Sequence, residues 1–64
     1  MKFWALVILS DLTLKRMWMD ESTAFIMLKS NSDMKIYNSA HYQEAVISKG
    51  GIVWKSVEEV AKLG

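Results

Sequence analysis

The stretch Leu12–Met19, which reads LTLKRMWM, decides between two folds for this chain of 64 residues. As a strand it places Leu14 and Trp18 on one face, with Arg16 intruding between them. As a helix it brings Leu14 together with Met17 and Trp18, three and four residues later. We favour the strand, because the short Ser10-Asp11 link before it suits a hairpin and a polar turn follows it.

Three further segments have strand character. The apolar run within residues 2–9 is continuous, as in a strand covered on both faces, and residues 23–29 form a second such run. Residues 34–37 alternate between apolar and polar, which places Met34 and Ile36 on the core side. Four turn-forming residues separate the last two segments, so the sequence predicts a hairpin there.

The remaining sequence carries helix signals. Residues 39–49 follow a pair of capping side chains, and Gly50 stands where a left-handed C-terminal cap is expected. The segment 57–63 follows Ser56, which forms a capping box with Glu59. A short return strand over 52–54 is expected between these two helices.

These elements predict a single small α+β domain over residues 1–64. Its antiparallel sheet of three to four strands forms a meander, packed by one helix over 39–49 and closed by a short C-terminal helix. The rival topology is βαββαβ, in which residues 11–20 are helical. The side chains expected in the core are Phe3, Ala5, Val7, Leu9, Phe25, Met27, Ile36, Val46 and Val57.

Composition excludes several classes of protein. With 52% hydrophobic and 23% charged residues the chain should fold, and a formal charge of +1 gives no field for steering a polyanion. The absence of cysteine excludes disulfides and thiolate metal sites, so nothing points to an oxidising compartment and we expect a cytoplasmic protein. The N-terminal apolar run is too short to cross a bilayer, and no membrane partner is expected.

Catalytic and metal-binding signals are weak. His41 and Glu44 share one side of the predicted helix, but a metal site would need further ligands from distant segments. No activated nucleophile accompanies them, and Gly50 and Gly51 follow a predicted helix rather than precede one, unlike a phosphate loop. We therefore expect that the protein is not an enzyme and that it binds no cofactor, no metal and no small-molecule substrate.

The favoured function is that of a small protein-interaction module, an inhibitor or regulator. The chain has three Trp, two Tyr, two Phe and five Met, and a domain of this size has too small an interior to bury all of these large side chains, so we expect some of them to face a partner. Tryptophan and arginine most often anchor interfaces, so the partner-binding candidates are Lys15, Arg16, Trp18 and Trp54. The partner is expected to be another protein or a second copy, forming a homodimer.

Single-stranded nucleic acid is the alternative partner. In the predicted meander Lys15, Lys29 and Lys35 would form one basic stripe beside Trp18 and Tyr37, as in proteins that stack bases on a sheet. The small net charge argues against it, because affinity for phosphates grows with the number neutralised.

Overall fold

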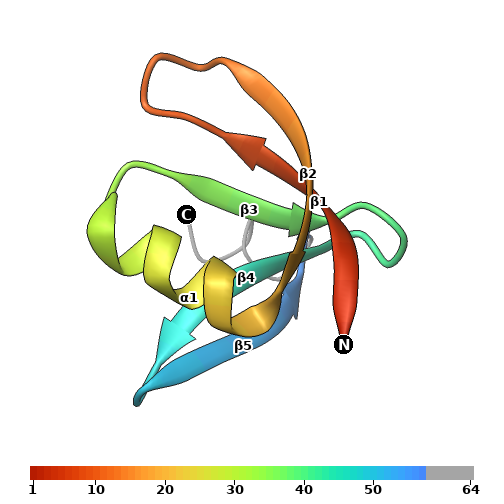
Figure 1. Cartoon of the computed structure of the whole chain (residues 1–64), viewed down its shortest axis with the longest axis vertical. Coiled ribbons are helices and arrows are strands. Elements are labelled where there is room, and N and C mark those ends of the chain that lie inside the picture. The colour runs from red at the N-terminus through yellow and green to blue at the C-terminus, as the bar shows by residue number, and fades with distance from the viewer. Residues whose placement is uncertain (58–64) are drawn as a thin grey trace.

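The strand β1 (Lys2–Ile8) lies inside a five-stranded antiparallel sheet with the order β2-β1-β3-β4-β5 (Figure 1). It pairs with β2 (Leu14–Asp20) on one side and with β3 (Lys35–Asn38) on the other. The strands β4 (Gln43–Ser48) and β5 (Gly51–Ser56) extend the sheet beyond β3. The computed structural model describes residues 1–57.

Within residues 1–57 the one complete helix is α1 (Glu21–Ser30), which follows β2 without a linker. The α+β class and the antiparallel sheet are therefore confirmed, with five strands in place of three to four. The strand alternative for 12–19 is confirmed against the helical one, although β2 begins at Leu14. Except for Val57, the helix predicted over 57–63 lies outside the described residues.

The strand predicted over 23–29 is wrong, because this segment lies within α1. The Asp20 carboxylate caps the helix by accepting a hydrogen bond of 2.8 Å from the Thr23 backbone N–H. Ala24 is buried, and Met27 and Leu28, three and four residues later, pack against the core. This spacing gives a short amphipathic helix, whose cap lies inside the segment that the sequence presents as a polar turn.

The helix predicted over 39–49 is also wrong, because residues 43–48 are β4. A tight turn joins β4 to β5, with φ of +29° at Lys49 and +83° at Gly50. Two consecutive residues of positive φ suit a two-residue hairpin, whose twist matches that of the flanking strands. Gly50 therefore serves a hairpin turn and not a helix cap, and the return strand predicted over 52–54 lengthens to Gly51–Ser56.

The predicted meander is wrong in its connections. β2 and β3 both run antiparallel to β1, so they share a direction and enclose β1 in a split β-α-β unit with α1 as the crossover. The link between β1 and β2 is also longer than the predicted pair of residues. The Leu9 N–H donates to the Thr13 carbonyl across it, and Leu12 has a φ of +67°.

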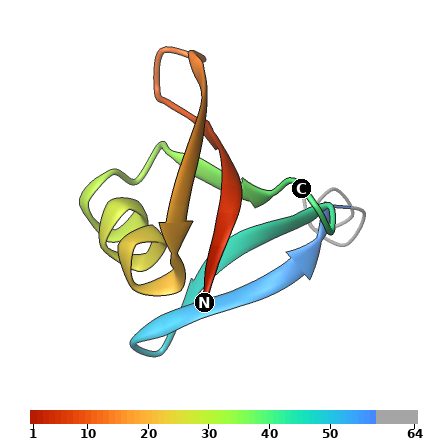
Figure 2. The same ribbon diagram turned by 45° about the vertical axis from the view of Figure 1, so that its right-hand side comes forward.

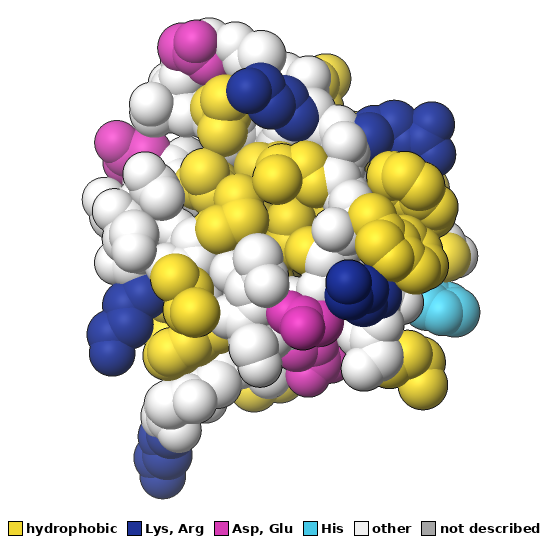
Figure 3. All heavy atoms as spheres, viewed as in Figure 1, with side chains coloured by type: hydrophobic (Ala, Val, Ile, Leu, Met, Phe, Trp, Pro, Cys, Tyr) yellow, Lys and Arg dark blue, Asp and Glu magenta, His cyan; other side chains and the backbone are white. Residues whose placement is uncertain are grey.

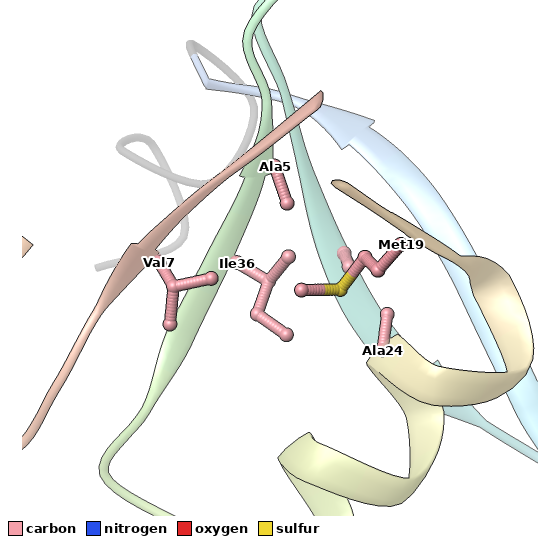
Figure 4. Close-up of a cluster of buried hydrophobic side chains, with 6 residues drawn as sticks. Ala5, Val7, Met19, Ala24 and Ile36 are labelled. Atoms are coloured by element: carbon pink, nitrogen blue, oxygen red, sulfur yellow. The ribbon is translucent and has the colours of Figure 1, made fainter. Parts of the chain in front are cut away.

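The core lies between the sheet and α1, where side chains from β1, β2, β3 and the helix point toward one another (Figure 4). Its buried members are Ala5, Val7, Met19, Ala24, Ile36 and Ala45. Three predicted core residues are fully buried (Ala5, Val7 and Ile36), and three more pack against the buried cluster (Phe3, Leu9 and Met27). Helical periodicity predicts Val46 in the core, but Ala45 is the buried residue because side chains alternate along β4.

The helix leaves part of the sheet uncovered. In Figure 2 the β1–β2 hairpin rises above α1, while β4 and β5 cross below it. Figure 3 shows hydrophobic side chains gathered in the middle of the face that carries the helix, between this hairpin and α1. Apolar side chains of the sheet thus remain uncovered on this side of the molecule.

Candidate interaction face

The two faces of the sheet differ in what covers them. Directly paired residues of antiparallel strands project to the same side, so the register assigns every side chain to a face. Ala5, Val7 and Ile36 project toward α1, on what we term the helix face. The larger side chains of the opposite side, the outer face, are Lys2, Trp4, Leu6, Ile8, Leu14, Arg16, Trp18, Asp20, Lys35, Tyr37, Glu44, Val46, Val53 and Lys55.

Two tryptophans form an exposed pair on the outer face. Trp4 and Trp18 are direct cross-strand partners, with ring centroids 5.3 Å apart and planes tilted by 56°. The Arg16 guanidinium carbon lies 5.8 Å from the centroid of the Trp4 ring. Trp4 is 50% exposed and Trp18 is 54% exposed. This indole pair is therefore ordered by its own contacts and is half open to solvent, as interface anchors are.

A pocket of about 410 Å³ opens beside the indole pair. Its described walls come from β1, β3, the following loop and the residue after β5: Leu6, Ile8, Tyr37, Asn38, Ser39, Tyr42 and Val57. The loop is fixed by hydrogen bonds, since the Ser39 hydroxyl donates to the Trp4 carbonyl at 3.1 Å and the Val57 N–H donates to the Tyr42 carbonyl. We term this the tyrosine pocket, because Tyr37 and Tyr42 supply its aromatic walls.

The outer face carries four basic side chains, Lys2, Arg16, Lys35 and Lys55, against two acidic ones, Asp20 and Glu44. Lys2 lies opposite Asp20, and Glu44 lies opposite Lys55, so four of its ionised side chains form neighbouring pairs of opposite sign. Arg16 and Lys35 have no acidic cross-strand neighbour, since their partners on β1 are Leu6 and Ile8. The face therefore combines exposed apolar and aromatic side chains with an excess of two positive charges.

The structure brings only two of the four predicted partner-binding residues together. Arg16 and Trp18 share the outer face, whereas Lys15 is opposite Val7 and so belongs to the helix face, where it is exposed. Trp54 also projects to the helix face. Its ring meets Phe3 edge to face at 5.0 Å, and its Nε1–H donates to a Glu21 carboxylate oxygen at 2.8 Å.

Sequence reasoning missed Trp4 and the tyrosine pocket. Trp4 lies inside a continuous apolar run, which gave no sign of which face would be covered. The pocket depends on β3 pairing with β1, a contact between segments about 30 residues apart. Only a correct assignment of α1 as a crossover would have placed these two strands side by side.

The basic stripe proposed for nucleic acid is not formed. Lys29 lies in the last turn of α1, Lys15 is on the helix face, and Lys35 is on the outer face. His41 and Glu44 do not share a helix either, because His41 is in a turn and Glu44 is in β4. Among residues 1–57 no group of three potential ligands could hold a metal ion.

Two carboxylates accept backbone hydrogen bonds near β2: Asp20 is its last residue, and Asp11 lies in the loop before it. The Thr23 backbone N–H lowers the pKa of Asp20, and hydrogen bonding by Thr13 lowers the pKa of Asp11. Both groups fix local turns, Asp20 as the cap of α1 and Asp11 across the β1–β2 loop.

Comparison of the chain with protein-family models, with curated proteins and with solved structures finds no match in any of the three. Within the described chain no helix has the length and apolar character needed to cross a membrane. The outer face therefore has to be interpreted from its own geometry.

Proposed function

We propose that this protein is a small non-enzymatic interaction module that binds another protein surface through its outer face. The observation that carries the proposal is the indole pair: two tryptophans, half exposed and ordered by Arg16, beside an apolar pocket. Large rigid rings of this kind fill pockets on a partner with little loss of conformational entropy.

The remainder of the outer face supports the same conclusion. Leu14 is 60% exposed at one end of the face and Val53 is 44% exposed at the other, so the apolar surface spans the sheet. Four of its six ionised side chains lie opposite a charge of the other sign, and an excess of two positive charges neutralises few phosphates, so a protein surface suits this face better than a polyanion. The proposal includes action as an inhibitor or regulator in the cytoplasm, by occupying the partner's surface.

The proposal is tested by comparing immobilised wild-type protein with the Trp18→Ala variant as baits in nuclease-treated lysate of the native host. We expect wild type to retain a specific protein, its own copy included, and Trp18→Ala to lose it. Retention should change little between about 0.05 M and 0.5 M salt, because an indole contact releases few counterions.

Ile26→Ala is the matched control for this experiment. Ile26 is 62% exposed on α1, so it presents comparable apolar area on a different part of the molecule. Loss of the captured protein with Ile26→Ala but not with Trp18→Ala contradicts the proposal. In a separate titration, binding of a single-stranded oligonucleotide that falls steeply with salt favours the alternative function over it.

A further inference from the structure

We infer that β2 binds an extended acidic segment of another protein, which joins the sheet as a further strand along the outer edge of β2. This inference rests on the proposed function, because the added strand lies beside the indole pair, and it names the form and charge of the partner. Its basis is a stretch of β2 that combines exposed side chains, backbone groups turned away from the sheet and two adjacent positive charges.

The first five residues of β2 form an uncovered edge of the sheet. The strand order places β2 at one end, with β1 as its one strand partner among residues 1–57. All of residues 14–18 are exposed, and in Figure 2 this hairpin rises above α1. The opposite edge, β5, is less open, because four of its six residues are half-buried and Trp54 is bonded to Glu21 of α1. We term residues 14–18 the edge segment.

Hydrogen bonds at its two ends show which backbone groups of the edge segment point outward. The Leu9 N–H donates to the Thr13 carbonyl, so these residues form a hydrogen-bonded pair of the β1–β2 ladder. Such pairs alternate with non-bonded ones in an antiparallel ladder. The Trp4 carbonyl, opposite Trp18, accepts from the Ser39 N–H on the far side of β1, as this alternation requires. The residues whose N–H and carbonyl groups face the outer edge are therefore Leu14, Arg16 and Trp18.

The charge of the edge segment selects an acidic partner. Lys15 and Arg16 are adjacent, on the helix face and the outer face respectively, and their cross-strand neighbours on β1 are both apolar. The flanking carboxylates, Asp11 and Asp20, lie outside the segment and already accept backbone hydrogen bonds. A lysine on an edge strand deters pairing with strands that cannot neutralise it. An added strand therefore gains most by placing one carboxylate on each face, opposite these two residues.

A second copy of β2 is a poorer occupant of this edge. Pairing two edge segments brings together four basic side chains, two from each copy, and no acidic one. A foreign strand instead neutralises Lys15 and Arg16, and its apolar side chains can lie beside Met17 on the helix face and Trp18 on the outer face. In chain order, an antiparallel strand that meets these requirements reads apolar, apolar, acidic, acidic, apolar.

A blocked peptide of sequence Thr-Val-Val-Glu-Glu-Val-Thr tests the inference, with backbone hydrogen exchange of the full chain followed by NMR. We expect the Arg16 and Trp18 N–H groups to exchange rapidly in the free protein and slowly with saturating peptide, because they enter the new ladder. The Met17 N–H should change less, since the same alternation already pairs it with β1.

Charge reversal at Lys15 tests the register of the added strand. Lys15→Glu should weaken binding of this peptide by roughly 10-fold, because an attractive pair becomes a repulsive one. The peptide Thr-Val-Val-Glu-Lys-Val-Thr, which reverses the charge opposite that position, should restore binding to the variant. Lys35→Glu is the matched control, because Lys35 is exposed on β3, two strands away, and the change in net charge is the same.

The outcomes separate this inference from the function beneath it. Unchanged exchange at Arg16 and Trp18 with peptide on the order of 10 mM overturns the strand addition, as does equal weakening by Lys15→Glu and Lys35→Glu. Protection of the same N–H groups that grows with protein concentration alone makes a second copy the occupant, and overturns it too. Capture of a protein that depends on Trp18 but leaves this exchange unchanged removes the added strand and leaves the proposed function standing.

Discussion

Trp54 and the indole pair show how the same residue type takes two roles on the two faces of one sheet. On the helix face, Trp54 meets Phe3 edge to face and donates a hydrogen bond to Glu21, the first residue of α1. On the outer face, Trp4 and Trp18 contact each other and Arg16, and both rings remain half exposed. The difference teaches that aromatic content alone does not locate a binding surface, since the position of the covering helix decides which rings are used for folding.

The largest difference between the faces should be in folding stability. Ile36→Ala empties a fully buried site between the sheet and α1, and should lower the free energy of unfolding by about 2–5 kcal/mol. That is a large share of the stability of a domain of this size. Val46 is half-buried on the outer face, so Val46→Ala should lower the free energy of unfolding clearly less in denaturant titrations. Equal costs would show that both faces are packed alike.

The next test compares alanine substitutions of two tryptophans on opposite faces of the sheet. Trp18→Ala should weaken binding of the partner by about 2 kcal/mol or more while the protein remains folded. Trp54→Ala should instead lower the denaturation midpoint, because it removes a side chain packed against the core. Calorimetric binding and thermal denaturation of both variants measure the two effects. A Trp54→Ala protein that is as stable as wild type but unable to bind reverses the assignment of the faces.

A smaller effect isolates the hydrogen bond that holds Trp54. Trp54→Phe keeps a ring next to Phe3 but removes the Nε1–H donor to Glu21, and should cost about 1 kcal/mol of unfolding free energy. Trp18→Phe has no described hydrogen bond of this kind to lose and should cost less. In a double-mutant cycle with Glu21→Ala, the Trp54→Phe cost should shrink, and full additivity of the two costs would argue against the bond.

The smallest effect concerns Asp20, where β2 passes into α1. Its pKa lies below the ordinary 3.8 because the folded carboxylate accepts the Thr23 N–H, so its stabilisation is complete above 3.8 and lost as pH falls through the folded pKa. The thermal midpoint should therefore drop on acidification. Asp20→Asn keeps a capping oxygen that does not titrate, so its midpoint should fall less. Superimposable pH profiles of the two proteins would remove this role.

Local signals predicted the strands whose character is independent of their neighbours. β1 is a continuous apolar run, and β3 contains Ile36 in clean alternation, and both lie close to their expected bounds. Three fully buried residues of the core followed from them. The antiparallel sheet and the α+β class were predictable on the same basis.

Residues 23–29 and 39–49 could not be assigned correctly, because their apolar patterns fit either structure. The first became helical through the Asp20 cap, and the second became a strand through the Lys49-Gly50 turn. Both decisions depend on one or two residues at the segment ends. Trp18 and Arg16 were identifiable as candidates by residue type, but their union with Trp4 required the register of β1 against β2.

The side-chain N–H signals of the three tryptophans, followed by heteronuclear NMR over a dilution series and then with a captured partner, test the account most directly. Binding through the outer face predicts that the Trp4 and Trp18 signals shift on association, while the Trp54 signal, fixed by its hydrogen bond to Glu21, stays in place. A shift of Trp54 with Trp4 and Trp18 unchanged would contradict it.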